Sequence, residues 1–443
     1  MPLMYLFMKV LLIQPSQFRE NGSLDKRQRR WLLGMTLPYV AALVPGDIQV
    51  EIKDDLLEDI TFKEDCDLVA FSFMSHQAPR AYQLAAGFRR RSIPVVMGGF
   101  HATLAPDECG EHADALVLGE AEESWPRLLR DFQAGRMQPR YQSQNFSDLK
   151  NLPVPRYDLV NLKRYKLLNI PSQTTRGCPY NCSYCEVTQV YGGKFRHRPV
   201  DEVIHEIQEI RRLTQSDFIY FVDDNFVADR NHALEIMERL IPLKLIYGCL
   251  ATTNVGDDPE VLDLMAKSGC LHVNIGMESI NPESLKAIKK KQNKVKDYER
   301  QFRALRNRGI GYSVNVMFGL DGDRPEIFDT TVDFLIKAKV PVAFMFILAP
   351  RPGTKIRDKL LAEGRIFDHD WTNYCGFKVV YHPKHMTAKQ LAEGYWRANR
   401  RFYSPLAILK RQSLHLFSLH MLPFNLFFAW AARRRFQPLD HYF

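Results

Sequence analysis

The chain lacks the features of a secreted protein. Its first residues, MPLMYLFMKVLLI, are apolar but have neither the basic start nor the small-residue cleavage site of a signal peptide. Only eight cysteines occur in 443 residues, and three of them are clustered, which does not suit a disulfide framework. We therefore expect a cytoplasmic protein in a reducing environment.

Acidic residues are almost absent from the end of the chain. Residues 401–443 carry six basic side chains and one acid, Asp440, so five of the nine net positive charges lie there. A basic surplus can attract nucleic acid, an anionic membrane or acidic ligands. No RNA-binding motif accompanies it, so we expect no nucleic-acid partner.

Formal charge is also absent from residues 412–432, QSLHLFSLHMLPFNLFFAWAA. A run of this length can span a bilayer, but Pro423, Asn425 and other polar residues interrupt it. We expect either an amphipathic segment that lies on a membrane or covers a substrate pocket, or plain core packing. A peripheral contact with the inner face of a membrane would use residues 412–435, in which 433–435 suit phospholipid head groups.

The rest of the composition is that of an ordinary globular protein, with 46% hydrophobic and 25% charged residues and enough chain for two or three domains. Short apolar runs and helical stretches alternate first in residues 8–140. The strands are expected at 9–14, 49–52, 67–73, 93–97 and 115–118, and the helices at 32–43, 81–90 and 122–132. This order predicts a doubly wound parallel sheet.

Ligands of such sheets bind beyond the carboxyl ends of the strands, where glycines allow a close approach. The candidate binding residues at those ends are Ser72, Ser75, Gly98, Gly99, His101, Gly119 and Glu120.

A proline-containing linker, expected at residues 141–171, separates this unit from a second alternation. Its strands are expected at 173–176, 217–222, 244–252, 271–276, 311–318 and 342–348, with a helix after each of the first five. Polar motifs follow the strands. The order predicts an open six-unit barrel with a site at the carboxyl ends of its strands.

Three cysteines, Cys178, Cys182 and Cys185, stand in C-x3-C-x2-C spacing within RGCPYNCSYCE. Thiolates this close together hold an iron–sulfur cluster or a zinc ion. Three cysteines would leave one iron of a four-iron cluster open to another ligand. The residues alone leave two plainer interpretations open: a zinc knuckle completed by a distant histidine, or three unrelated thiols.

The triplet resembles the signature of the radical S-adenosylmethionine (radical SAM) enzymes, in which the open iron binds SAM. FVDDNF, GMES and FGLDGD occur in the order in which that family places its SAM contacts. The resemblance implies a [4Fe-4S] cluster on the three cysteines and a partial barrel of six strand–helix units. It also implies SAM contacts from Asp223, Asp224, Glu278, Gly319 and Tyr184.

By the family pattern, Asp223 and Asp224 bind the amino group of SAM and Glu278 binds the ribose. The backbone of Gly319 lines the adenine, and Tyr184 packs on it. The residues themselves leave plainer alternatives open, because the Asp pair could cap a helix and Glu278 could form an ordinary salt bridge.

The motifs GGFHATLAPDE and VLGEAEESWPRLL resemble the cobalamin-binding domain that precedes many radical SAM domains. The resemblance implies that the candidate residues at the strand ends of residues 8–140 contact cobalamin. The D-x-H-x-x-G motif of other cobalamin proteins is missing, so we expect no motif histidine on the cobalt. A nucleotide-binding or degenerate Rossmann domain, with His101 touching only backbone, is the alternative.

The expected fold class is therefore α/β. It consists of an N-terminal Rossmann-like cobalamin-binding domain at 8–140, a linker at 141–171, a partial (β/α)6 radical SAM barrel at 172–370, and a mainly helical C-terminal extension at 371–443. The five remaining cysteines are expected to be structural. They are Cys66, Cys109, Cys249, Cys270 and Cys375.

This domain order resembles that of the cobalamin-dependent radical SAM methyltransferases, and the last hundred residues loosely resemble members that act on hopanoids or bacteriochlorophyll side chains. The resemblance implies methyl transfer from methylcobalamin to an unactivated carbon of a small hydrophobic substrate, through a 5′-deoxyadenosyl radical. It also implies a flavodoxin or ferredoxin-type reductant. An oxidative cyclase or rearrangement enzyme shares the layout. A cluster and corrinoid sensor and a zinc-finger nucleic-acid binder are the non-enzymatic alternatives.

Overall fold

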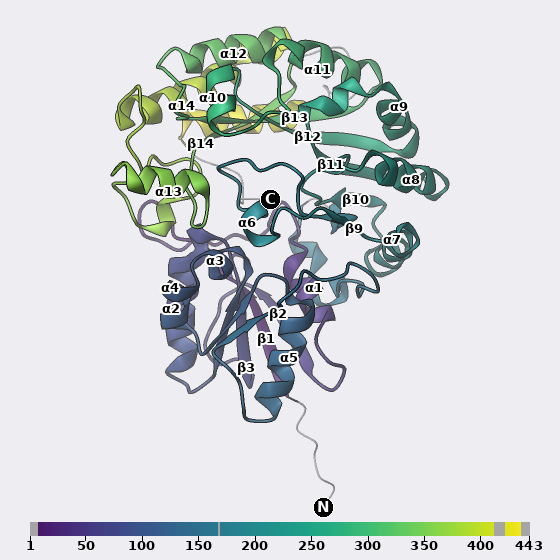
Figure 1. Ribbon diagram of the computed structural model, residues 1–443, viewed down its shortest axis with the longest axis vertical. Helices are drawn as coiled ribbons and strands as arrows, with labels where there is room; N and C mark the ends of the chain where they lie inside the picture. Colours follow the sequence, from purple (N-terminus) through teal and green to yellow (C-terminus); the bar gives the residue numbers. More distant parts are fainter. Residues whose placement is uncertain (1–7, 167–168, 412–420, 436–443) are drawn as a thin grey trace, which may run out of the picture.

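The computed structural model describes residues 8–166, 169–411 and 421–435. It has two α/β parts, one above the other in Figure 1, and helices that follow them. The expected class is confirmed: a Rossmann-like first domain, an open barrel of parallel strands, and a helical extension.

The first domain is a six-stranded parallel sheet in the order β2-β1-β3-β4-β5-β6. The strands are β1 Lys9–Gln14, β2 Gln49–Asp54, β3 Leu68–Ser72, β4 Val95–Gly98, β5 Ala115–Leu118 and β6 Arg140–Gln142. The helices are α1 Thr36–Ala42, α2 Ala78–Arg89, α3 Gly99–Leu104, α4 Pro106–His112 and α5 Ala121–Gln133. The sixth strand, β6, was not predicted.

Strand β1 explains why this sheet is covered on both faces. Leu11 and Ile13 are buried in the cluster under α2 to α4, whereas Val10 and Leu12 are buried in the cluster under α1 and α5. The continuous apolar run KVLLIQ is therefore a central parallel strand with helices on either side, as Figure 1 shows.

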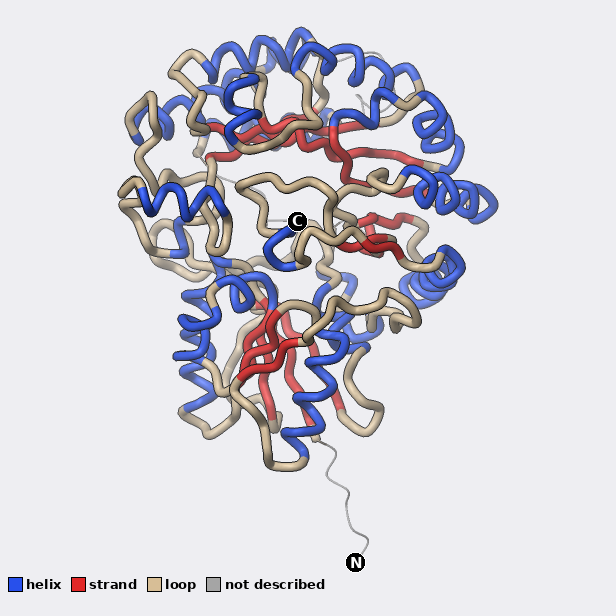
Figure 2. The backbone as a smooth tube through the Cα atoms, viewed as in Figure 1, coloured by secondary structure: helices blue, strands red, loops and turns tan. Residues whose placement is uncertain are grey.

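The barrel sheet has the order β14-β13-β12-β11-β10-β7, and all its neighbouring strands are parallel. The strands are β7 Asn169–Ser172, β10 Phe218–Phe221, β11 Ile246–Thr252, β12 Cys270–Glu278, β13 Gly311–Phe318 and β14 Val342–Ile347. The helices are α7 Val200–Thr214, α8 Arg230–Leu240, α9 Pro259–Ser268, α10 Pro282–Ala287, α11 Tyr298–Asn307, α12 Ile327–Lys337 and α13 Lys355–Ala362. Helices α7 to α12 form an arc around the outside of this curved sheet (Figure 2).

The predicted first barrel strand at 173–176 is wrong in its position. The strand that pairs with β10 is β7, and Thr175–Arg176 forms the separate strand β8, antiparallel to β9 Arg196–His197. The chain bends between β7 and β8 because Thr174 and Thr175 turn their N–H groups toward the carboxylate of Asp223.

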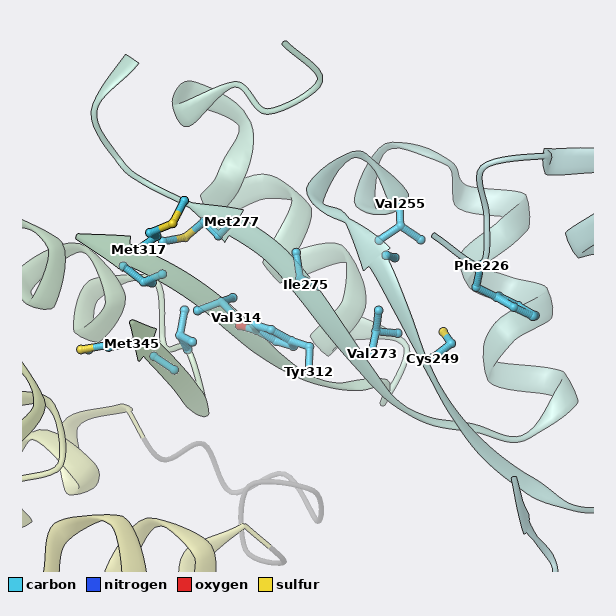
Figure 3. Packing of buried hydrophobic residues seen from close by; sticks show 14 of the residues in the cluster. Phe226, Cys249, Val255, Val273, Ile275, Met277, Tyr312, Val314, Met317 and Met345 are labelled. Carbon is cyan, nitrogen blue, oxygen red and sulfur yellow. The ribbon is translucent and has the colours of Figure 1, made fainter. Parts of the chain in front are cut away.

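Alternate residues of the barrel strands differ in polarity. On β12, Val273 and Ile275 belong to the buried cluster beneath the helices, and Val314 lies beside Ile275 in the register (Figure 3). The residues between them are polar or small: Asn274 pairs with Ser313 in the register and accepts a hydrogen bond from its hydroxyl at 3.1 Å. This polar face is the inside of the barrel.

The C-terminal extension covers the open edge of the barrel. Helix α14 Ala388–Phe402 packs on α12 and β14, and α15 Pro405–Arg411 and α17 Leu422–Arg433 follow. The hydroxyl of Tyr403 donates to the carbonyl oxygen of Ala343 at 2.8 Å and accepts from its N–H at 3.3 Å. An edge strand that would otherwise expose these groups is thereby protected.

Residues 412–420 of the uncharged segment lie outside the described residues. The described remainder of the segment forms most of helix α17. One face packs: Asn425 accepts from Arg411 at 2.7 Å, and Phe428 stacks on Tyr403. The other face is open, with Leu426 56% and Trp430 43% exposed. Within the described residues, no helix is long and apolar enough to cross a bilayer.

Candidate active site

The three cysteines lie on one loop between β8 and α6 Val187–Val190, which Figure 1 places between the two domains. Gly177 begins this loop with a φ of +87°, and a Cβ there would collide with the carbonyl oxygen of Lys194. Glycine is therefore required directly before Cys178. The middle of the loop, residues 179–181, reaches the surface, whereas Cys182 is buried.

The surroundings of the cysteine thiols favour thiolates that are bound to iron over free thiolates. Burial raises the pKa of Cys178 to about 11 and that of Cys185 to about 12, so thiolates are costly here unless iron compensates them. Among the described residues, no three His, Cys, Asp or Glu side chains have the geometry of a single-ion site.

Buried polar atoms without a hydrogen-bond partner surround the same loop. Buried polar groups are normally satisfied, so a bound polar ligand would explain them. The residues that carry these atoms on or next to the loop, or after strand β10, are Ser183, Glu186, Thr188, Asn225 and Gln292. Gln292, which contributes two such atoms, lies beside Cys182.

The two predicted aspartates have different surroundings. Asp223 is fully buried and accepts from the N–H of Thr174 at 3.1 Å, from its hydroxyl at 2.9 Å, and from Thr175. Asp224 accepts from the backbone of Gly177, and burial, followed by the charge of Asp223, raises its pKa to about 7. Asp223 thus braces the bend after β7, and Asp224 interacts electrostatically with Cys178.

The helix-cap alternative for these aspartates is wrong. Helix α8 begins at Arg230, and its N-cap is Asp229, whose carboxylate accepts from the N–H of His232 at 3.1 Å.

Glu278 lies at an irregularity in strand β12, with a φ of +65°. Lys290 donates to its carboxylate at 2.9 Å, and both side chains are buried, so the salt-bridge alternative describes its contact in this structure. A Cβ on Gly276 would meet Glu278 Oε1 at 2.8 Å and Lys290 Nζ at 3.1 Å. Glycine at 276 therefore makes room for this ion pair on the inner face.

Lys290 also joins this pair to the cluster loop. Its Nζ lies 3.3 Å from the hydroxyl of Tyr184, between the second and third cysteines. The sequence showed Lys290 only as one member of a basic run, so its buried role was missed.

Gly319 supports its own loop in this structure. A Cβ there would collide with the hydroxyl of Tyr381, which donates to the Gly319 carbonyl oxygen at 2.6 Å. The N–H groups of Gly319 and Leu320 donate to the carboxylate of Asp323, both at 3.0 Å. Its place beside adenine stays a prediction.

Arg351 is a second residue that sequence reasoning missed. It follows β14 and donates at 2.7 Å to the carboxylate of Glu186, the residue directly after Cys185. Glu186 is buried and Arg351 is half-buried, and the pair ties the last loop of the barrel to the cysteine loop. No spacing in the sequence relates the two residues, so only the fold could reveal it.

At the carboxyl edge of the first sheet, the predicted glycines serve different purposes. A Cβ on Gly99 would meet Ser72 Oγ at 2.7 Å, and one on Gly98 would meet the carbonyl oxygen of Val117 at 3.3 Å. These two glycines are required by packing. Gly119 has a φ of +73° and no atom within 4 Å of a Cβ, so it faces open space.

His101 is fully buried, with side-chain partners on both ring nitrogens. Nδ1 lies 3.0 Å from Ser75 Oγ, and Nε2 lies 3.1 Å from the hydroxyl of Tyr82. Tyr82 donates to Glu108 at 2.8 Å, and Glu108 accepts from the indole N–H of Trp371 at 2.8 Å. The idea that His101 touches only backbone is therefore wrong, because it belongs to a network that reaches the barrel side of the molecule.

Glu120 likewise joins the two domains. It accepts from the N–H of Ser147 at 2.6 Å and from Arg196 at 3.0 Å, and it lies 3.4 Å from Arg176. Although burial opposes the shift, Arg196 and Arg176 hold the pKa of Glu120 below its usual range. Next to it, Glu122 accepts from Arg176 at 2.6 Å.

The five cysteines outside the cluster loop are free thiols, and Cys109, Cys249 and Cys270 are buried. This placement agrees with a structural role.

Comparisons with known proteins identify two parts of the chain. The model of the radical SAM superfamily matches residues 172–335, and the model of the B12 binding domain matches residues 37–129. The two segments follow one another in the order expected from the sequence.

Three relatives match most of the chain. It is 29% identical over 416 residues to a bacteriochlorophyllide d C-12(1)-methyltransferase of Chlorobaculum tepidum, covering 91% of this chain and 89% of the relative. It is 26% identical to a hopanoid C-2 methylase of Rhodopseudomonas palustris, covering 87% and 75%. An anaerobic magnesium-protoporphyrin IX monomethyl ester cyclase of Cereibacter sphaeroides is 25% identical, covering 71% and 55%.

A solved structure shares the whole architecture. The radical S-adenosylmethionine methyltransferase TsrM of Kitasatospora setae, with tryptophan and a SAM analogue bound, superposes with a TM-score of 0.66. The match covers 97% of this chain and 89% of that chain at 19% identity. Because the two sequences are only 19% identical, the structural similarity establishes that they share a fold and nothing more.

Proposed function

We propose that this chain, which combines a radical SAM domain with a B12-binding domain, adds a methyl group to an unactivated carbon of a tetrapyrrole-like or hopanoid-like substrate. It is a cobalamin-dependent radical SAM methyltransferase whose cofactors are a [4Fe-4S] cluster, SAM and cobalamin. Because the chain is an enzyme, the interpretation as a cluster and corrinoid sensor is set aside.

One observation carries the proposal: the cysteine loop and the ligand edge of the first sheet face each other. Helix α3, which begins at Gly99, lies against α6, which follows the cysteines. The ring of Phe100 meets that of Tyr191 edge-on, with centroids 6.0 Å apart. Two cofactors bound at these edges would therefore lie next to one another, as a methyl transfer between them requires.

The cofactors would supply the difficult chemistry. When bound, the cluster and SAM supply a 5′-deoxyadenosyl radical that removes hydrogen from the substrate, and methylcobalamin supplies the methyl group. The residues of the chain bind and orient. Asp224 would pair with the ammonium of SAM, and Asp223 would hold the backbone that positions Asp224. Glu278 would accept from the ribose hydroxyls while the hydrogen bond from Lys290 holds its carboxylate in place.

An aromatic wall supports a hydrophobic substrate. Phe344 lies beside Asn315 in the register, so it shares the inner face of the barrel with the polar residues. Two positions along β14, Phe346 stacks on Phe377 with centroids 6.5 Å apart. Flat or greasy substrates pack well against such rings.

The cyclase alternative is tested by one experiment. The reconstituted enzyme is incubated with SAM that is isotopically labelled in its methyl group, together with lipid and pigment extracts. Label in a product that is heavier by one methyl group is expected. Consumption of substrate without incorporation of label would instead favour a cyclase or rearrangement enzyme.

We also propose a peripheral membrane contact through α17. Leu422, Leu426 and Trp430 recur at helical spacing on its exposed face, and Arg433 ends the stripe. Among the described residues 405–411 and 421–435 there is no acidic side chain. Such a face suits an anionic lipid surface. Co-sedimentation with vesicles containing phosphatidylglycerol should fall in Leu426→Glu/Trp430→Glu, and equal sedimentation would refute the contact.

A further inference from the structure

The segment 288–294 covers the cysteine loop with alternate residues. The carbonyl oxygen of Ile288 accepts from the N–H of Ser183 at 3.0 Å. Lys290 then contacts Tyr184, and Gln292 lies beside Cys182. Asn293 donates to the carbonyl oxygen of Gly276 at 2.8 Å. The inward residues of this segment thus fasten it directly over the cluster ligands.

The lysines between these residues, together with those just before and after them, are exposed. We call these exposed side chains the lysine rim. It consists of Lys286, Lys289, Lys291, Lys294 and Lys296. Residues 286–296 contain no acidic residue, and within the described residues no ion pair includes any member of the rim. Lys289 has a left-handed φ of +58°.

Another lysine, which is not part of the lysine rim, borders the exposed tip of the cysteine loop. Lys355, at the start of α13, donates to the side chain of Asn181 at 2.9 Å. The exposed part of the cysteine loop therefore has lysines on two sides.

So many unpaired like charges on one short segment repel one another, and salt screens this repulsion only in part. A complementary acidic surface would remove the repulsion and would orient an approaching protein. The location limits what that protein does, because the segment that carries the rim also places Lys290 against Tyr184 and Gln292 beside Cys182.

We propose that the lysine rim is the docking surface of a small acidic electron-carrier protein of the flavodoxin or ferredoxin type. The inference rests on the proposed radical SAM function, which needs one electron per SAM cleaved. One electron leaves the reduced flavin or iron–sulfur centre of the carrier, and the cluster held by Cys178, Cys182 and Cys185 accepts it. The carrier dissociates in its oxidised form.

The test compares two reductants on the full-length reconstituted enzyme. The rim variant is Lys289→Glu/Lys291→Glu/Lys294→Glu. The control variant, Lys267→Glu/Lys384→Glu/Lys389→Glu, makes the same charge change at exposed lysines elsewhere. Formation of 5′-deoxyadenosine is measured with reduced flavodoxin, with reduced ferredoxin and with dithionite, a small reductant that needs no docking surface.

With a protein carrier, the rate in the rim variant should fall about tenfold or more and the control should keep its rate. With dithionite, all three enzymes should agree within about twofold, because the rim does not contact SAM. Raising the salt concentration should slow the carrier-driven reaction of the wild type. Equal carrier-driven rates in rim and control variants would overturn the proposal.

Binding of the oxidised carrier, followed by fluorescence anisotropy, gives a readout that does not depend on turnover. The Kd should rise about tenfold in the rim variant only. An unchanged Kd would overturn the docking surface even if the rim variant had lost activity through misfolding. Absence of 5′-deoxyadenosine with dithionite in the wild type would instead refute the proposed function.

Discussion

The cysteine loop and the ligand edge of the first sheet lie face to face, yet they use their polar residues differently. Around the loop, buried polar atoms such as those of Ser183 and Asn225 lack partners. At the edge of the first sheet, His101 and Glu120 are fully engaged by other residues. The first region is prepared for a polar ligand, whereas the second uses side chains to hold the domains together.

This contrast says how each cofactor would be recognised. SAM carries an ammonium, a carboxylate and hydroxyls, so it needs charged side chains that are placed individually. Cobalamin is large, and Gly119, where a Cβ would meet no atom within 4 Å, would leave it open space and backbone. A cobalamin site made mostly of shape would leave a weaker trace in the sequence than a SAM site made of individually placed charges.

The largest effect is expected at the cysteine loop. Cys182→Ala should remove the cluster and lower 5′-deoxyadenosine formation by more than about a thousandfold, because a four-iron cluster with two thiolate ligands is poorly held. Iron content and visible absorbance measure the loss. Cys66→Ala, which changes a half-buried thiol of the first domain, is the matched control and should keep its iron. Loss of iron from both variants would contradict the assignment.

Substitutions of Asp223 and Asp224 should affect protein stability and SAM binding separately. Asp224→Asn should raise the Kd for SAM by about 10- to 100-fold with little change in stability, because it loses one charged hydrogen bond. Asp223→Asn should lower the free energy of unfolding by about 1–3 kcal/mol, since an amide cannot accept all the hydrogen bonds from Thr174 and Thr175.

Isothermal titration with SAM and urea unfolding measure the two quantities. If both substitutions changed only the affinity for SAM, the proposed division of labour between the aspartates would be wrong.

A pair of neighbouring substitutions tests the edge of the first sheet. Gly119→Val should weaken cobalamin binding about tenfold by filling the open space with a side chain. Glu120→Gln should leave the Kd for cobalamin within about twofold and lower the free energy of unfolding by about 1–3 kcal/mol, because it weakens the pairs with Arg176 and Arg196. If Glu120→Gln weakened cobalamin binding and Gly119→Val did not, Glu120 would instead belong to the cobalamin site.

The smallest effect concerns acid stability. Although burial opposes the shift, the His101 ring 3.8 Å away and hydrogen bonds from Trp371 and Tyr82 lower the pKa of Glu108 to about 2 from an ordinary 4.5. A lowered folded-state pKa contributes stability that is present above pH 4.5 and is lost as the pH falls toward 2. Unfolding of the wild type should therefore depend more steeply on pH in this window than unfolding of Glu108→Gln. Identical slopes would argue against the network.

Much of the fold could be predicted because its signals are local. Short apolar runs and helical patterns predicted the parallel strands and most of the helices, apart from the short β6 and the position of the first barrel strand. That strand was misplaced because Thr174 and Thr175, which look like strand residues, bond to Asp223 49 and 48 positions away. A local sequence pattern cannot reveal a hydrogen-bond partner that lies so far away along the chain.

The sequence by itself determined that Cys178, Cys182 and Cys185 lie together, because residues within one short loop remain neighbours however the rest of the chain folds. Only the tertiary structure decided what Lys290, Arg351, His101 and Glu120 do. Glu108 and Trp371 stand 263 positions apart, and Arg351 and Glu186 stand 165 apart. Such pairs exist only after packing has brought distant segments together and excluded water from between them.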